Sequence, residues 1–227
     1  MKIRCPDGTE KTVEECKNCP SPCHPSPVRH ALLHGRDRKR KPKEKPAFGV
    51  TTLTTNCLRQ SYYRLTEEEI RDLEKLWIFS RGHAMHEFVT KTLEEGQKEV
   101  FVKKKFPYYD IIGFIDALHE DTIHEFKTTS NLPQEPQKHH ILQAQAYYSL
   151  LDELKQSATK KIIITYLSMN KIKHFEVIPR NILPWLKTRA AKLTQALKTN
   201  IPPPAEATWL CNYCDHKDLC DKENQVS

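Results

Sequence analysis

The sequence carries two acidic side chains and a lysine in a pattern that could hydrolyse phosphate esters. The segment GFIDAL at 113–118 contains Asp116, and HEFKTT at 124–129 contains Glu125 and Lys127. Both segments have strand-like composition, and alternate residues of a strand share a face, so we expect Phe126 to point away from Glu125 and Lys127 into the core. Two carboxylates can hold a hard divalent cation, with the lysine near the attacking water or the phosphate. The pattern alone is weak evidence, because it also occurs on exposed hairpins.

Eight cysteines form a second set of residues with possible chemistry. Four lie near the N-terminus with the spacing C-x10-C-x2-C-x3-C, and three more lie within CNYCDHKDLC at 211–220. A closed thiolate metal site needs four ligands, so the C-terminal three require a partner. Either His216 completes a local zinc site, or a distant cysteine completes a cluster.

Two helical segments offer further candidates. RGHAMHEF contains His86, with Gly82 four residues before it and His83 as a rival, and QAQAY places Gln143 and Tyr147 at i and i+4 on one face of a helix. Taken singly, such residues are more often surface or packing residues than ligands.

The order G-x-x-x-H, D, E-x-K, Q-x-x-x-Y across residues 80–150 is far more specific than any one of its members. It resembles the RecB-type nucleases of the PD-(D/E)XK superfamily, although no proline precedes Asp116. The resemblance implies an α/β restriction-endonuclease-like core, with a mixed sheet flanked by helices. It implies that Mg²⁺ or Mn²⁺ is bound by His86, Asp116, Glu125 and the main-chain carbonyl of Phe126. It also implies that Lys127 is the catalytic lysine and that Gln143 and Tyr147 position DNA.

One cysteine before these motifs and C-x2-C-x5-C after them resemble the CRISPR-associated RecB-type iron–sulfur exonucleases, and are similar to the AddB subunit of bacterial helicase–nucleases. The resemblance implies that a [4Fe–4S] cluster, or alternatively a [2Fe–2S] cluster, is held by Cys57, Cys211, Cys214 and Cys220. Such a cluster would close a long loop and reduce the chain entropy of the unfolded state.

The N-terminal cysteines lie outside this resemblance. A structural zinc site suits their local spacing, with ligands Cys5, Cys16, Cys19 and Cys23, and His24 could replace Cys23. About 25 residues cannot build a core alone, so a metal would be needed to fold them. The module could contact DNA, dock a partner or serve only as a folding staple.

The elements that must position these residues can be read from local patterns. We expect helices at 67–77, 80–95, 139–154 and 181–198, and strands at 99–106, 109–120, 122–129, 160–168 and 171–179, the last two as a pair. The expected organisation is a zinc module at 1–25, a basic linker at 26–46 and a nuclease domain with its iron–sulfur staple at 47–227.

Charge and hydropathy limit the functional classes. The formal charge is +7, from 36 Lys and Arg against 29 Asp and Glu. Two four-thiolate sites, each holding a +2 centre, would each net −2 and leave about +3, so global charge is weak evidence for nucleic-acid binding. The run at 35–45 is either a solvated linker or a phosphate-binding arm. No apolar run is long enough for a membrane span and no signal sequence is present, which predicts a cytoplasmic protein, where cysteines favour metal sites over disulfides.

The sequence therefore predicts a metal-dependent DNA exonuclease that acts on single-stranded ends or overhangs. The resemblance implies a role in CRISPR adaptation, beside an integrase. A nuclease of a virus or mobile element, acting in recombination or replication, is the alternative with the same chemistry. A non-catalytic DNA-binding scaffold is the alternative of another class, and the intact D…E-x-K set argues against it.

Overall fold

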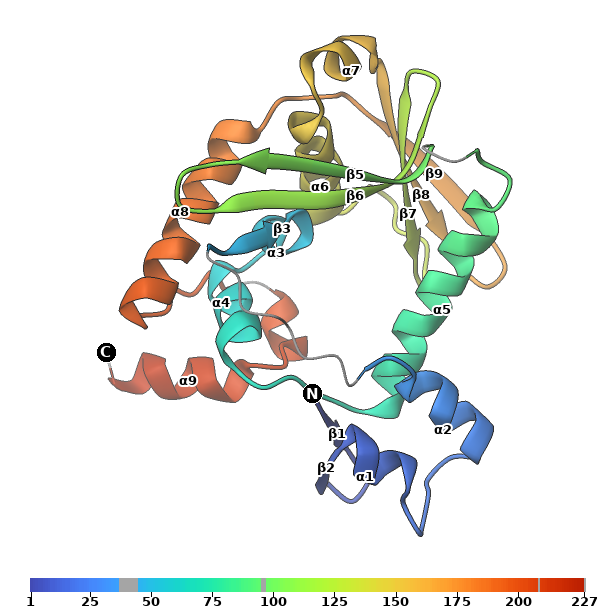
Figure 1. Ribbon diagram of the computed structural model, residues 1–227, viewed down its shortest axis with the longest axis vertical. Coiled ribbons are helices and arrows are strands. Elements are labelled where there is room, and N and C mark those ends of the chain that lie inside the picture. Colours follow the sequence, from blue (N-terminus) through green and yellow to red (C-terminus); the bar gives the residue numbers. More distant parts are fainter. Residues whose placement is uncertain (37–44, 95–96, 208, 227) are drawn as a thin grey trace. The chain divides into compact units, whose positions relative to one another are not determined.

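The computed structural model describes residues 1–36, 45–94, 97–207 and 209–226 (Figure 1). The chain divides into two compact units, each assembled from two stretches of sequence. The first unit comprises Met1–Lys43 and Glu67–Val89, and the second comprises Glu44–Thr66 and Thr90–Ser227. The acidic centre and the C-terminal cysteines belong to the second unit, whereas the N-terminal cysteines and His86 belong to the first.

The first unit contains a small sheet with the strand order β2–β1–β4. Strand β1 runs antiparallel to β2 and parallel to β4. The strands are β1 (Lys2–Arg4), β2 (Glu10–Thr12) and β4 (Ile70–Arg71), and the helices are α1 (Val13–Lys17), α2 (Ser26–Leu33) and α5 (Leu73–Thr90). The apolar core of this unit is formed by Ile3, Val13, Cys16, Leu32, Leu33, Leu73 and Leu76.

Two segments of the first unit differ from the sequence expectation. Residues 26–33 of the expected linker form α2, because Leu32 and Leu33 are buried in the core and Pro27 sits in the first helical turn, where it is tolerated. Residues 37–44, which carry most of the basic run, lie outside the described residues. The helix expected from residue 67 begins only at Leu73, because Asp72 Oδ1 accepts a hydrogen bond from Lys75 N at 2.6 Å and caps the helix there.

The second unit is built around a six-stranded mixed sheet in the order β3–β6–β7–β8–β9, with β5 also paired to β6. The strands are β3 (Ala47–Gly49), β5 (Lys98–Lys105), β6 (Asp110–His119), β7 (Thr122–Thr128), β8 (Lys161–Leu167) and β9 (Ile172–Val177). The helices are α3 (Val50–Thr54), α4 (Leu58–Thr66), α6 (Lys138–Leu150), α7 (Glu153–Ala158), α8 (Leu183–Thr199) and α9 (Lys217–Val226), with a 3-10 helix, η1, at Trp209–Tyr213. The expected mixed sheet flanked by helices is confirmed.

Helix α6 packs against β5, β6, β7 and β8, and α3 lies beside it (Figure 1). The central strands bury large aliphatic side chains beneath these helices, including Ile111, Ile115, Ile162 and Ile164. The expected pair β8 and β9 is antiparallel. The helix expected at 139–154 instead divides after Leu150, because the Asp152 side chain accepts from Lys155 N and caps α7.

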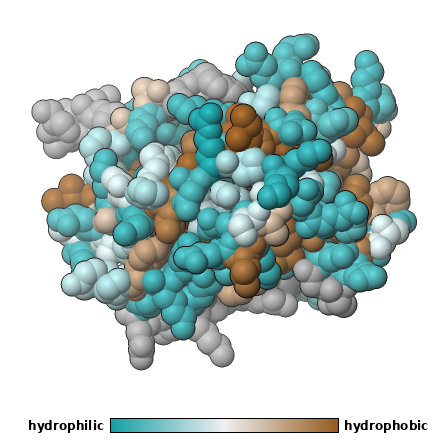
Figure 2. Space-filling view, turned by 90° about the horizontal axis from the view of Figure 1, so that it is seen from above, coloured by the Kyte–Doolittle hydropathy of each residue, from teal (hydrophilic) through white to brown (hydrophobic). Residues whose placement is uncertain are grey.

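The surface shown in Figure 2 is mostly hydrophilic, with separate hydrophobic patches. Among the described residues, no helix is both long and apolar enough to cross a membrane.

Candidate active site

The β6–β7 hairpin brings the two predicted carboxylates together. Its antiparallel register pairs Ala117 with His124, and Asp116 Oδ2 accepts a hydrogen bond from the main-chain N–H of Phe126 at 2.8 Å. Asp116 therefore reaches across to the backbone between Glu125 and Lys127. The burial differs from our expectation: Glu125 is only 1% exposed, whereas Phe126 is half-buried and its ring stacks with that of His124.

The strand pairing explains why Asp116 can make this contact. One edge of β6 pairs with β5 through positions 110–115 and 117. On the other edge, β3 pairs with β6 as far as Ile112, and β7 pairs from Ala117 onward. Asp116 thus lies where β6 passes from one neighbour to the next, and its side chain accepts from Phe126 N at this gap in the ladder.

Gln143 connects the carboxylate to the lysine. Lys127 Nζ donates to Glu125 Oε1 at 2.5 Å and to Gln143 Oε1 at 3.0 Å. The Gln143 amide nitrogen in turn donates to Glu125 Oε1 at 2.8 Å and to the Tyr147 hydroxyl at 3.0 Å. Both ends of the amide are used, so Gln143 fixes Glu125 and Lys127 relative to each other. The predicted role of Gln143 and Tyr147 in positioning DNA stays a prediction, since their described contacts are within this network.

Burial and negative charge keep the Tyr147 hydroxyl protonated. The ring is 5% exposed. Desolvation, followed by the charge of Glu125, raises the pKa of Tyr147 far above its usual range, and the charge of Asp116 adds to the shift. The charges of both carboxylates thus act on the pKa of Tyr147, whose hydroxyl is hydrogen-bonded to Gln143.

His140 is a second buried group beside Lys127. Burial, followed by the Lys127 charge and that of His139, lowers the pKa of His140 from 6.5 to about 2. Its Nδ1 lies 2.8 Å from the Tyr166 hydroxyl, which also accepts from Gln137 N at 3.0 Å. A neutral His140 that accepts the Tyr166 proton at Nδ1 satisfies both groups.

This arrangement predicts acid sensitivity. Below pH 6.5 the unfolded chain protonates His140 while the folded protein does not, so the unfolded state binds more protons and stability falls by about 1 kcal/mol per pH unit. His140→Gln, which keeps an acceptor for Tyr166, should flatten the decline in unfolding free energy between pH 7 and 5. His174→Gln, at an exposed position on β9, should not. Urea unfolding at three pH values measures this, and equal slopes for wild type and His140→Gln would contradict it.

Gly113 gives Tyr147 the space that it occupies. A Cβ at position 113 would lie 2.6 Å from Tyr147 Cε1 and 3.0 Å from Val50 Cγ2. Any side chain there would push the Tyr147 ring and, through Gln143, disturb the Glu125–Lys127 pair.

We therefore expect Gly113→Ala to lower the rate of the predicted DNA cleavage roughly 10- to 100-fold, the scale of a misplacement of about 1 Å. Overpacking should also reduce stability by roughly 1–3 kcal/mol. Gly49→Ala is the matched control, because a Cβ there meets only Thr51 and Thr52 hydroxyls at 3.6 Å. Single-turnover cleavage and thermal melting check both variants, and a Gly113→Ala protein with the rate and melting temperature of the wild type would refute the packing argument.

The predicted histidine ligand lies in the first unit. His86 is half-buried on α5, and its rival His83 is exposed on the same helix. The acidic centre belongs to the second unit, so the role of His86 as a metal ligand stays a prediction.

The segment after Cys57 lies beside the C-terminal cysteines. The Arg59 guanidinium donates to Cys220 Sγ at 3.7 Å, and the Gln60 amide donates to Cys214 Sγ at 3.6 Å. These contacts join residues 161 and 154 positions apart in the chain. The fold therefore brings the segment that follows Cys57 beside Cys214 and Cys220.

A buried arginine stabilises this junction. Arg189 on α8 donates to the carbonyls of Leu53 at 2.6 Å and Thr55 at 2.8 Å, and pairs with Glu206 at 3.2 Å. Glu206 also accepts from Leu58 N at 2.7 Å, at the start of α4. Hydrogen bonds and an ion pair thus connect Glu206 and Arg189 to the segments on both sides of Cys57.

The N-terminal cysteines share one cavity in the first unit. A pocket of about 220 Å³ is lined by all four of these cysteines, namely Cys5, Cys16, Cys19 and Cys23. Lys11 and Arg29 line the same pocket. Lys11 Nζ donates to Cys19 Sγ at 3.1 Å, which lowers the pKa of that thiol. Burial raises the pKa of the Cys16 thiol. Four cysteines around one cavity are a ligand set that structural zinc sites use.

Within the ranges that the structure describes, no three His, Cys, Asp or Glu side chains are arranged as a metal-binding group. The donor chemistry still suits the predicted metals. The carboxylates of Asp116 and Glu125 and the carbonyl of Phe126 offer oxygen ligands, which Mg²⁺ and Mn²⁺ prefer, and thiolates suit zinc and iron–sulfur clusters. The assignment of each metal to its residues remains a prediction.

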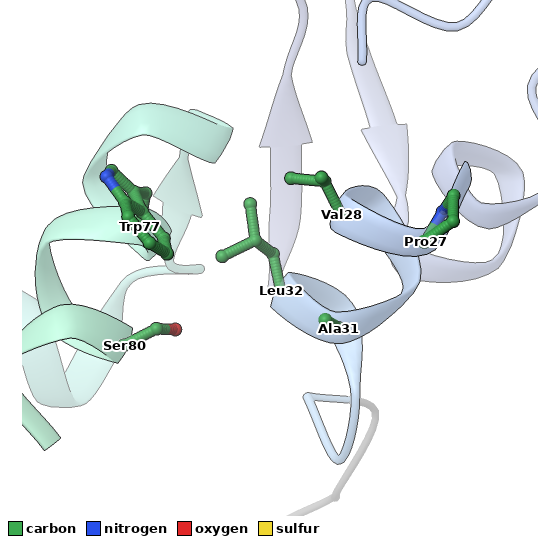
Figure 3. A pocket seen from close by; sticks show the side chains of 6 residues that line it. All are labelled: Pro27, Val28, Ala31, Leu32, Trp77 and Ser80. Carbon is green, nitrogen blue, oxygen red and sulfur yellow. The ribbon is translucent and has the colours of Figure 1, made fainter. Parts of the chain in front are cut away.

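An apolar pocket in the first unit carries no such chemistry. It has a volume of about 360 Å³ and is lined by Pro27, Val28, Ala31, Leu32, Trp77 and Ser80. Figure 3 shows Trp77 and Ser80 on α5 facing the side chains of α2. The lining contains neither a titratable group nor a metal ligand.

A model of the PD-(D/E)XK nuclease superfamily matches residues 29–221. The chain therefore belongs to the PD-(D/E)XK nuclease superfamily, and the expected superfamily is confirmed. Among solved structures, the crystal structure of SSO0001 is similar, with a TM-score of 0.61 and 22% identity over 85% of this chain and 93% of that chain. A candidate exonuclease from Eubacterium rectale matches with a TM-score of 0.38 and 13% identity over 90% of this chain and 86% of its own. No curated protein matches the sequence.

Sequence reasoning missed three residues that support the site. His140 precedes Gln143 by one helical turn, and that spacing is the signal that places it on the same face. Gly113 stands inside a strand, where glycine often marks a close approach. Arg189 gives no local signal, because its carbonyl partners on Leu53 and Thr55 are more than 130 residues away.

Proposed function

We propose that the protein is a metal-dependent DNA nuclease whose reaction takes place at Asp116, Glu125 and Lys127. The observation that carries the proposal is the network in which Gln143 holds Lys127 against a buried Glu125, one strand from Asp116. Membership of the PD-(D/E)XK nuclease superfamily supports the same reading.

Each of these side chains has a separate role in the proposed phosphodiester hydrolysis. A divalent cation bound there would neutralise phosphate charge and make hydroxide available near neutral pH. Two hydrogen bonds fix the Lys127 ammonium beside Glu125 and Gln143. From there its charge would stabilise negative charge that develops on the phosphate. Asp116, anchored by Phe126 N, and Glu125, anchored by Gln143, supply the acidic ligands.

The finer features of the proposal rest on the resemblance of the motifs. They are exonuclease action at single-stranded ends, an iron–sulfur cluster on Cys57, Cys211, Cys214 and Cys220, and work beside an integrase in CRISPR adaptation. The contacts of Arg59 and Gln60 with Cys220 and Cys214 support the cluster. The shared cysteine cavity of the first unit supports a zinc site on Cys5, Cys16, Cys19 and Cys23.

Digestion of matched DNA substrates tests the function. Linear single strands labelled at either end, a closed circular single strand and a blunt duplex are incubated with the full chain in Mn²⁺, Mg²⁺ or EDTA. We expect metal-dependent loss of linear single strands, while the circle survives. Cleavage of the circle, which has no end, would show that the protein is an endonuclease and not an exonuclease. If every substrate stays intact with either metal, the proposed function is rejected.

A further inference from the structure

Two exposed phenylalanines face each other across β5 and β6, which lie side by side in Figure 1. Phe101 pairs directly with Phe114 in the antiparallel register, and their ring centroids are 5.1 Å apart. Their exposed fractions are 53% and 56%. The next residues along the strands, Val102 and Ile115, point the other way and are buried.

The aromatic pair is on the face of β6 opposite to that of Gly113, which packs against Tyr147 of α6. Residues two apart on a strand share a face, and on β5 Lys103 and Lys105 follow Phe101 at this spacing and are exposed. Along β5, the face therefore presents two aromatic rings and then two lysines, one of which, Lys103, also pairs with Asp110 at 2.6 Å.

The size and charge of this face indicate what it binds. A half-exposed phenylalanine offers about 100 Å², so the pair offers about 200 Å², well below the roughly 800 Å² that each partner buries in a stable protein complex. The same area matches one or two nucleobases, which stack on aromatic rings irrespective of sequence while basic residues follow the phosphates.

We propose that Phe101 and Phe114 form a base-stacking platform for single-stranded nucleic acid, with Lys103 and Lys105 along its backbone. This inference rests on the proposed function, because it assigns the platform to the single strand that the nuclease would cleave. Bases in a duplex are already stacked on each other, so the platform selects single strands.

Binding of a fluorescent oligothymidine to the full chain tests the platform, in EDTA so that cleavage does not intervene. Phe101→Leu and Phe114→Leu should each raise the dissociation constant about tenfold, which is within the range for loss of one stacked base. Affinity for a blunt duplex should not change. Phe101→Trp should retain single-strand binding, and thermal melting checks that each variant is folded.

The complementary test changes the nucleic acid by removing bases from it. Wild type should bind an oligonucleotide with abasic sites near its end about tenfold more weakly than the intact strand, whereas the Phe101→Leu/Phe114→Leu protein should bind both equally. Lys105→Gln should reduce the slope of log affinity against log salt by about 0.7. Lys104→Gln, on the opposite face of β5, is its control and should not.

The outcomes separate the platform from the nuclease assignment. Dissociation constants within twofold of wild type for the double variant, or no preference of wild type for intact over abasic strands, would overturn the platform even if wild type degrades DNA. Loss of stacking-dependent binding in the variants, together with a wild type that cleaves no DNA, would support the platform and reject the proposed function. If the variants also lose affinity for RNA of the same sequence by the same factor, the platform binds both nucleic acids.

Discussion

Asp116→Asn, Glu125→Gln and Lys127→Met should each lower the single-turnover rate of DNA cleavage by at least about a thousandfold, or about 4 kcal/mol of activation free energy. The reason is shared: in the proposed mechanism Asp116 and Glu125 would be the acidic ligands of the cation, and Lys127 would carry the positive charge that meets the developing negative charge. Rates at saturating Mn²⁺ and saturating DNA measure the effect.

Glu176→Gln is the matched control, because it makes the same change at an exposed position of strand β9. It should keep the wild-type rate. Since the three residues act as a unit, the double variant Glu125→Gln/Lys127→Met should be no slower than the slower single variant. It should also be more stable than Glu125→Gln alone, which leaves the Lys127 ammonium without its carboxylate partner. Rates within tenfold of wild type for Glu125→Gln would show that cleavage takes place elsewhere.

The second large effect concerns the cysteines. Protein purified without oxygen should be brown and contain about four irons and one zinc per chain. Cys57→Ser should lose the iron and the colour but keep the zinc, and its melting temperature should fall by more than about 10 °C, because the long loop is no longer closed. Metal analysis, visible absorption and thermal melting provide the measurements.

Cys5→Ser is the reciprocal control. It should lose zinc and keep iron, since Cys5 lines the separate cavity of the first unit. If Cys57→Ser keeps a full complement of iron, the assignment of Cys57 to the cluster is wrong. A wild type with zinc alone after anaerobic purification would reject the cluster altogether.

The acidic centre could be predicted from the sequence because its parts are local. Asp116 and the Glu125–Lys127 pair lie on consecutive strands, so one hairpin is enough to bring them together. The strand-like composition of both segments predicts β6 and β7 directly. The buried state of Glu125 could not be read in this way, since it depends on the packing of Gln143 from α6.

Two helix boundaries were missed for the same local reason. Asp72 and Asp152 each cap a helix by accepting from the backbone N–H of a lysine three residues later, Lys75 and Lys155. An aspartate that can cap a helix is present in both segments, but apolar residues continue across it and predict one uninterrupted helix.

The division into two units could not have been predicted from local patterns. Residues 67–89 belong with the N-terminal residues, since Ile70 and Arg71 of β4 pair in parallel with Lys2 and Ile3 of β1. Parallel pairing between distant segments leaves no signature in either segment alone. The sequence expectation instead grouped residues 67–89 with the rest of 47–227, and those domain boundaries stay a prediction.

The dependence of the cleavage rate on Mn²⁺ concentration tests the central claim most directly, with wild type and Asp116→Asn/Glu125→Gln compared on one labelled single strand. We expect the wild-type rate to be negligible in EDTA and to rise to saturation with Mn²⁺, while the double variant stays at least about a thousandfold slower at every concentration. Cleavage by wild type in EDTA, or a double variant that follows the wild-type curve, would contradict hydrolysis at this acidic centre.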